Sequence, residues 1–255
     1  MHLKAFRETL ILFITKPTQS YVYYTTSRCG IESKEETLFV RGFTSKNFYL
    51  SFQAANMNCL ECIERVIKER RSHRFYQDRP VEREKLEKLI ELAMWAPSAM
   101  NRQQWFFVVV SGQKLRELIK AIEKSYDLIL PRLKMFFSDK PKVINLTKQF
   151  FKNLGNAPVA IFAYYTPTGD DYSDVQSVSA SIQNILLAAH AMGLGSCWMT
   201  GPVQVEDEIN KILGISGKKL VAVITIGYPA KVPPVPPRRD CDKKVIWMTD
   251  GPEND

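Results

Sequence analysis

Three short apolar runs, separated by longer stretches of helical periodicity, constrain the fold of this chain more than any other feature. The runs cover 105–110, 158–165 and 220–227 and are rich in aromatic and β-branched residues. Such residues pack well on a pleated, buried surface, so the runs predict strands. Because helical sequence separates each run from the next, the pattern predicts an α/β or α+β layer architecture.

Helical patterns fill the intervals between these runs. The first begins with Asn58 and Glu61, which are spaced as a capping box, and continues to about residue 69. Apolar residues at helical spacing predict further helices at 82–95, 113–124, 173–192 and 205–213, and a mixture of helix and mobile chain at 126–153. Five prolines between residues 229 and 237 exclude a regular element there, so the tail is expected to lie over a surface.

The bulk properties indicate a globular protein with a modest basic excess. The 255 residues carry a formal net charge of +8, and 45% of them are apolar. This excess suits an anionic small ligand. The basic residues form no long run and few lie beside aromatic ones, so nucleic-acid binding is not expected. No apolar run approaches the roughly 20 residues that span a bilayer, so no membrane role is expected. Five irregularly spaced cysteines favour a reducing compartment, the cytoplasm.

The sequence changes character near Met57. Residues 1–56 are rich in Thr, Ser, Tyr and Phe and show no sustained periodicity, whereas regular patterns fill 57–255. We expect 57–255 to form the functional domain. Residues 1–56 are expected to be a poorly ordered extension or to lie upstream of the true start of translation. An accessory segment that packs on the surface of the protein is the alternative.

A cluster of basic residues ends the first predicted helix and reads RRSHR from Arg70 to Arg74. Guanidinium groups donate paired, charge-assisted hydrogen bonds to phosphate oxygens, so the cluster is a candidate phosphate receptor. A solvated basic helix end, favoured by the helix dipole, is the simpler interpretation of the cluster taken alone.

Two further blocks carry the next candidate residues. The polar loop 96–105 reads APSAMNRQQW and offers amide side chains that both donate and accept, which suits the edge of a heterocycle. The block 193–202 reads GLGSCWMTGP, and its glycines let backbone amides approach a ligand closely. It follows a helix and lacks the third glycine of a dinucleotide-binding fingerprint. Taken alone, the first loop is better explained as a turn that caps neighbouring backbone.

Together with the ending GYPA and PPRR, these blocks resemble the nitroreductase family of FMN-dependent flavoproteins, in the same order and over about 57–245. The resemblance implies an α+β fold, a three-layer α/β/α sandwich with a mixed sheet flanked by helices. It also implies an intertwined homodimer that binds FMN at the subunit interface. One departure stands out, because Gln104 occupies the place where the family usually has proline before the tryptophan.

The resemblance also carries cofactor roles onto individual positions. Arg70, Ser72 and Arg74 would hold the flavin phosphate and ribityl chain, with Arg71 adjacent. The second block would reach the flavin from the other subunit through Pro97, Ser98, Ala99 and Asn101, with Gln103 near the ring. Backbone amides would meet the flavin edge at Trp198, Met199, Thr200 and Gly201. Either Arg238 or Arg239 would close on the phosphate.

The implied activity is hydride transfer from NADH or NADPH through FMN to a small organic oxidant, such as a nitroaromatic or a quinone, by a ping-pong mechanism. FMN supplies the chemistry, so no catalytic side chain and no metal are expected. Dehalogenation, flavin fragmentation or dehydrogenation on the same fold is the alternative, because a fold does not decide its chemistry. A non-enzymatic flavin-binding redox sensor that uses Cys59 and Cys62 is another.

Overall fold

The computed structural model describes residues 9–10, 24–25 and 58–248. The chain divides into two compact units, residues 1–65 and 66–255. In the first unit, the two-residue strands β1 (Thr9–Leu10) and β2 (Tyr24–Thr25) pair antiparallel. The prediction that 1–56 is a poorly ordered extension lies almost wholly outside the described residues.

The second unit is built on a four-stranded sheet. Its strands are β3 (Trp105–Ser111), β4 (Val159–Tyr165), β5 (Gly195–Met199) and β6 (Lys219–Gly227), in the order β3-β4-β6-β5. The three predicted strands are confirmed as β3, β4 and β6. All pairings between these strands are antiparallel. In the described residues, the mixed character expected of the sheet is limited to one parallel bridge, between Ser72 and Ser196.

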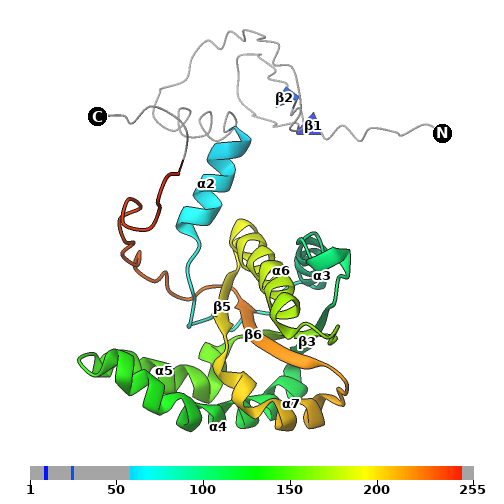
Figure 1. Ribbon diagram of the computed structural model, residues 1–255, viewed down its shortest axis with the longest axis vertical. Helices are drawn as coiled ribbons and strands as arrows, with labels where there is room; N and C mark the ends of the chain where they lie inside the picture. Colours follow the sequence, from blue (N-terminus) through cyan, green and yellow to red (C-terminus); the bar gives the residue numbers. More distant parts are fainter. Residues whose placement is uncertain (1–8, 11–23, 26–57, 249–255) are drawn as a thin grey trace, which may run out of the picture. The chain divides into compact units, whose positions relative to one another are not determined.

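Helices cover both faces of this sheet, so the predicted α/β/α sandwich is confirmed. On one face lie α3 (Arg83–Ala93) and α6 (Asp171–Ala191). On the other lie α4 (Gly112–Phe137), α5 (Pro141–Asn153) and α7 (Glu206–Leu213). Figure 1 shows the sheet between the two helical layers. The stretch 126–153, expected to be partly mobile, is helical apart from the short turn between α4 and α5.

Burial on both faces explains why the sequence of the central strand β4 is continuously apolar. All seven of its residues are buried. Phe162 and Tyr164 face the core beneath α4, whereas Ile161 and Ala163 face the core beneath α6. A strand buried on both faces needs apolar residues at every position rather than at alternate ones.

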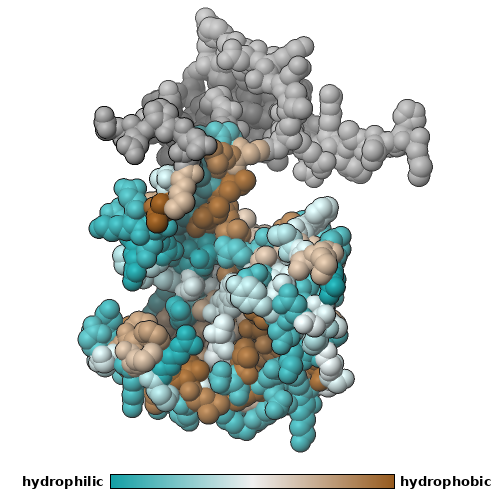
Figure 2. All heavy atoms as spheres, viewed as in Figure 1, coloured by the Kyte–Doolittle hydropathy of each residue, from teal (hydrophilic) through white to brown (hydrophobic). Residues whose placement is uncertain are grey.

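The helix that precedes the arginine cluster is α2 (Cys59–Glu69). The predicted capping box is confirmed, because Asn58 Oδ1 accepts from the amide of Glu61, and Glu61 Oε2 accepts from the amide of Asn58. None of its residues is buried, and Figure 2 shows apolar side chains on its surface. Cys62 is a free, exposed thiol, so it is not joined to Cys59. None of the described helices is long and apolar enough to cross a membrane.

Candidate functional site

The arginine cluster lies along the beginning of β5. Ser72 forms a parallel bridge with Ser196, and the amide of His73 donates to the Ser196 carbonyl at 2.9 Å. The same stretch continues to Tyr76, which bridges Pro229 just after β6. The first and third predicted blocks, far apart in sequence, are therefore adjacent in the structure.

Buried contacts fix the backbone of this arginine segment, residues 70–74. The hydroxyl of Tyr76 donates to the carbonyl of His73 at 2.8 Å and lies 2.7 Å from Thr225 Oγ1. Burial raises the pKa of Tyr76 far above its ordinary value, so the hydroxyl stays protonated as a donor. The amide of Tyr76 donates to the Gly155 carbonyl at 2.9 Å. The segment is thereby anchored to both β6 and the turn after α5.

The three arginines have different surroundings. Arg70 Nε is buried and has no hydrogen-bond partner among the residues described. Arg71 instead donates to the carbonyls of Lys68 and Arg70, at 2.6 and 2.8 Å, which caps the end of α2. Arg74 is exposed, and its guanidinium lies 6.0 Å from the ring centroid of Phe150. Arg70 and Arg74 therefore keep donors for a ligand, although Arg74 Nη1 also donates to the Ser72 carbonyl at 3.4 Å, whereas Arg71 caps α2.

His73, within the arginine segment, is only 6% exposed. Its Nδ1 lies 3.2 Å from the carbonyl oxygen of Lys231, so the imidazole packs beneath the start of the tail. Burial lowers its pKa, and the nearby charges of His190 and Arg71 act in the same direction, against the hydrogen bond to Lys231. The buried His73 side chain therefore joins the arginine segment to the start of the tail.

The third block contains β5, a strand that the sequence did not predict, and it presents backbone at the edge of the sheet. Among the described strands β5 pairs only with β6, and the bridge from Ser72 lies along its other edge. Because the Ser196 carbonyl faces the arginine segment, the backbone N–H and C=O of Trp198, two residues on, point out from the same edge. The indole Nε1 of Trp198 is buried and has no hydrogen-bond partner in the described residues. Two buried donors, on Arg70 and Trp198, thus lack partners beside one strand.

After β5 the chain turns into a 3-10 helix, η3 (Gly201–Val205). Met199 is buried toward α4, and Thr200 is exposed. A Cβ on Gly201 would lie 2.6 Å from the Phe151 ring, so the close approach of this turn to α5 requires glycine. Of the predicted contacts at 198–201, Met199 is buried, Trp198 and Gly201 are half-buried, and Thr200 is exposed.

The second block lies at the opposite edge of the sheet, just before β3. It contains the 3-10 turn η1 (Ala99–Asn101), and Met100, Asn101 and Gln103 have φ angles of 52°, 53° and 50°. These positive values are rare for residues other than glycine. Pro97, Asn101 and Gln103 are exposed, and Ser98 and Ala99 are half-buried.

Within one chain the structure does not bring the two halves of the predicted site together. The second block precedes β3, whereas the arginine segment flanks β5, and these are the two edge strands of the sheet. Three strand spacings separate such edges, about 14 Å. The blocks also lie at different ends of the strands, because Trp105 aligns with Tyr165 and Ser196 aligns with Ile226, at the Val159 end of β4.

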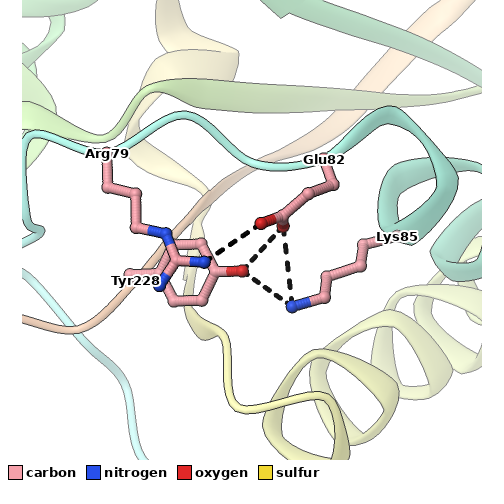
Figure 3. Close-up of polar contacts among 4 residues, drawn as sticks. All are labelled: Arg79, Glu82, Lys85 and Tyr228. Carbon is pink, nitrogen blue, oxygen red and sulfur yellow. Dashed lines mark hydrogen bonds and ion pairs between the residues drawn. The ribbon is translucent and has the colours of Figure 1, made fainter.

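The tail leaves β6 through a polar cluster that sequence reasoning missed. The hydroxyl of Tyr228 donates to Glu82 Oε2 at 2.6 Å, Lys85 Nζ donates to the same hydroxyl at 2.7 Å, and the Arg79 guanidinium lies 3.7 Å from the ring centroid (Figure 3). The hydrogen bond from Tyr228 is the main reason that the pKa of Glu82 falls to about 2. Farther on, Arg238 and Arg239 are exposed, and the described contacts place neither one against the arginine segment.

Comparison with solved structures supports the fold. The structure titled as the FMN-dependent nitroreductase from Mycobacterium smegmatis in complex with NADPH superposes with a TM-score of 0.63 and 21% identity, covering 75% of this chain and all of that one. A BluB-like flavoprotein from Clostridium difficile superposes with a TM-score of 0.60 and 26% identity, covering 73% of this chain and 99% of that one.

Sequence comparison gives relatives with two kinds of name. A protein of Archaeoglobus fulgidus, named as a candidate NADH dehydrogenase/NAD(P)H nitroreductase, is 34% identical over 176 residues, covering 66% of this chain and 86% of that protein. The iodotyrosine deiodinase of Thermotoga neapolitana is 31% identical over 176 residues, covering 66% and 88%. The model of the Nitroreductase family matches residues 67–228, most of the described chain. The chain therefore belongs to the nitroreductase family.

Proposed function

We propose that this protein is an FMN-dependent oxidoreductase that takes hydride from NADH or NADPH and reduces a small organic oxidant. The observation that carries the proposal is the pair of buried, unpartnered donors, Arg70 Nε and Trp198 Nε1, beside β5. Buried polar groups are nearly always hydrogen-bonded in folded proteins. A ligand with acceptors at this strand edge would give both donors partners.

The arginine segment supports a phosphate at one end of that ligand. Arg70 offers a buried N–H and Arg74 an exposed guanidinium, and Ser72 lies between them. Arginine binds phosphate oxygens through parallel charge-assisted hydrogen bonds, more strongly than neutral donors do. The phosphate of FMN is the expected occupant. Arg238 or Arg239 would close over it from the tail.

The backbone of β5 supports the flavin ring at the other end. FMN, when bound, accepts a hydride from NAD(P)H and passes two electrons to the second substrate, which predicts ping-pong kinetics. The outward-facing backbone N–H of Trp198 would donate to the polar edge of the ring. Fixed donors at that edge favour the negative charge that a reduced flavin carries. In this proposal the protein binds and orients the flavin, and no side chain acts as a nucleophile.

A homodimer is part of this proposal, because the second block is far from the arginine segment within one chain. Pro97, Ser98, Ala99, Asn101 and Gln103 would reach the flavin of the partner subunit. Exposed apolar surface supports such an assembly: Leu60, Ile63 and Ile67 on α2 are each more than half exposed. Phe106 and Val109 on the edge strand β3 are 37% and 39% exposed. Apolar surface of this kind is characteristic of protein interfaces.

Reductive dehalogenation is the second candidate, favoured by the similarity to the Thermotoga neapolitana iodotyrosine deiodinase. It would use the same flavin site and differ in the second substrate. The two candidates therefore share every prediction about FMN binding. The two candidates can be distinguished only by testing which oxidants reoxidise the reduced protein.

The test is the absorbance spectrum of the purified full-length protein, before and after NADH or NADPH is added without oxygen. We expect bound flavin that bleaches with at least one of the two. A colourless protein that takes up no added FMN would overturn the proposal. The reduced protein is then mixed with a nitroaromatic compound, a quinone or a halogenated tyrosine. Reoxidation by the halogenated tyrosine alone would favour dehalogenation.

A further inference from the structure

The residue in the place of the family's usual proline, Gln104, sits in a buried polar network. Its side chain is 6% exposed, and Nε2 donates to Asp174 Oδ1 at 2.8 Å and to Ser177 Oγ at 3.1 Å. Asp174, in the first turns of α6, is fully buried and also accepts from the amide and the hydroxyl of Thr168, at 2.8 and 2.7 Å. The network therefore joins the beginning of β3 to the beginning of α6.

The same network holds the strained segment 98–103. Ser177 Oγ accepts from the amide of Ala99 at 3.1 Å, so one serine serves both Ala99 and Gln104. Ser98 Oγ accepts from the amide of Gln103 at 3.0 Å. Three residues of this segment have positive φ angles, a conformation that persists only where surrounding contacts impose it. The partly buried bond from Ala99 to Ser177 and the buried bond from Gln104 to Ser177 are described contacts that join this segment to α6.

The network uses the donor of the amide at position 104, whereas Oε1 of Gln104 has no hydrogen-bond partner among the described residues. A buried carboxylate needs donors around it, and Nε2 of Gln104 is one of the three described donors to Asp174. An apolar side chain would remove that donor, and a glutamate would place a second carboxylate against the first. A proline would also restrict Gln103, because residues before proline avoid the conformation with φ near 50° that Gln103 adopts.

We propose that Gln104 is a positioning residue that fixes segment 98–103 in the conformation in which it meets the flavin of the partner subunit. The inference rests on the proposed function for the identity of the ligand. The mechanical part, that Gln104 holds the segment, does not depend on any ligand. The two parts are therefore tested by different measurements.

The mechanical part is tested by hydrogen exchange of the cofactor-free protein. Gln104→Met keeps the side-chain length and removes the donor, so the amides of Ala99 and Gln103 are expected to exchange about tenfold faster, as for a lost hydrogen bond to a charged group. Peptides from β4 report global stability and measure how much of the effect is shared by the whole domain. The matched control is Gln113→Met, the same change at an exposed glutamine on α4. Unchanged exchange at Ala99 and Gln103 in Gln104→Met would overturn the inference.

Swapping the amide and the carboxylate between positions 104 and 174 tests the hydrogen bond from Gln104 to Asp174 itself. Gln104→Glu faces Asp174 with a second carboxylate and is expected to loosen the segment, and Asp174→Asn is expected to do so as well. In the double variant the asparagine amide donates to the new carboxylate, so exchange at Ala99 should return close to the wild-type rate. If the double variant exchanges as fast as the two single changes combined, the proposed pairing is wrong.

The functional part is tested by the rate at which FMN leaves the wild type and Gln104→Met. We expect dissociation about tenfold faster in the variant, in proportion to the loosened segment. If the wild type binds no FMN, the proposed function fails while the exchange data still decide the role of Gln104. If FMN leaves both proteins at the same rate although the segment is loosened, the segment does not contact the flavin and the inference is overturned.

Discussion

Gly155 packs directly against the backbone of Arg74. A Cβ placed on Gly155 would lie 2.1 Å from the Arg74 carbonyl oxygen, far inside van der Waals contact, and the glycine has a φ of +64°. The backbone of the turn after α5 therefore packs directly against the backbone of the arginine segment. Because backbone opposes backbone here, the contact cannot be relieved by rotating a side chain.

The first prediction follows from this contact. Gly155→Ala should displace the Arg74 carbonyl, destabilising the protein by about 1–3 kcal/mol for overpacking in addition to about 1–2 kcal/mol for the positive φ. Gly214→Ala is the matched control, because Gly214 has a φ of +69° and open space around its Cβ position. The measurement is the free energy of unfolding from urea titrations of both variants. Equal losses in the two would show that the close approach to Arg74 costs nothing.

The second prediction concerns the phosphate. Arg70→Ala and Arg74→Ala should each weaken FMN retention by about 1.5–3 kcal/mol, the worth of a hydrogen bond to a charged group. Arg83→Ala, which removes an exposed arginine paired with Glu87 on α3, controls for the loss of one positive charge. Flavin content after gel filtration, followed by titration with FMN, measures the effect. If both site variants retain FMN as the wild type does, the phosphate of FMN does not bind at Arg70 and Arg74.

The third prediction concerns the cluster around Tyr228. The pKa of Glu82 is lowered to about 2, chiefly by the hydrogen bond from Tyr228, so the carboxylate is stabilised in its charged form. The contribution of this contact is full above the ordinary pKa of a glutamate and is lost as the pH falls toward 2. Tyr228→Phe removes the donor, so the Glu82 pKa should rise toward its ordinary value, and the stabilisation that remains around the charged carboxylate should be lost at a higher pH than in the wild type.

Carboxyl NMR of Glu82 across the acidic range measures this shift directly. Tyr172→Phe, a change of the same kind at an exposed position of α6, should leave the Glu82 titration unaltered. A Glu82 midpoint that stays low in Tyr228→Phe would assign the effect to the backbone amide of Glu82, with Arg79 and Lys85, instead.

Sequence periodicity predicted most of the fold because its signals are local. The three buried runs and the capping box at Asn58 are read from neighbouring residues. The strand β5 was missed because its five residues are preceded and begun by glycines, and its extended form comes from pairing with β6. α4 was predicted too short, although it continues through Pro131 because Ile129, Leu130 and Leu133 pack on the core. Packing with distant elements thus outweighs local propensity.

In the candidate site, too, the features set by local sequence could be predicted, and those set by contacts between distant residues could not. The arginine segment and the Trp198 block could be selected from residue chemistry, and the structure places them side by side. The supports of the site could not be predicted, because they join distant positions: Tyr76 with Thr225, Gln104 with Asp174, Tyr228 with Glu82. Arg71 was selected for its charge, but its guanidinium caps α2.

The last prediction tests whether each flavin site is shared between two subunits. One inactive chain carries Arg70→Ala and Arg74→Ala, and the other carries Asn101→Ala and Gln103→Ala. In a mixed dimer with shared sites, one site combines both sets of damage, and the other receives an intact arginine segment from one chain and an intact second block from the other. Co-expression with random assortment should therefore restore about one quarter of the wild-type flavin sites.

A site contained in a single chain gives the opposite result, because every chain in the mixture is then damaged. The readout is flavin per protomer in the mixture, compared with each variant expressed alone. Wild-type chain mixed with either variant serves as the control for assembly, since such dimers keep one intact site under the shared arrangement. The separation of the two blocks on opposite edge strands, β3 and β5, favours restoration. A mixture as poor in flavin as its two components would place the whole site within one subunit and would remove the main argument for the homodimer.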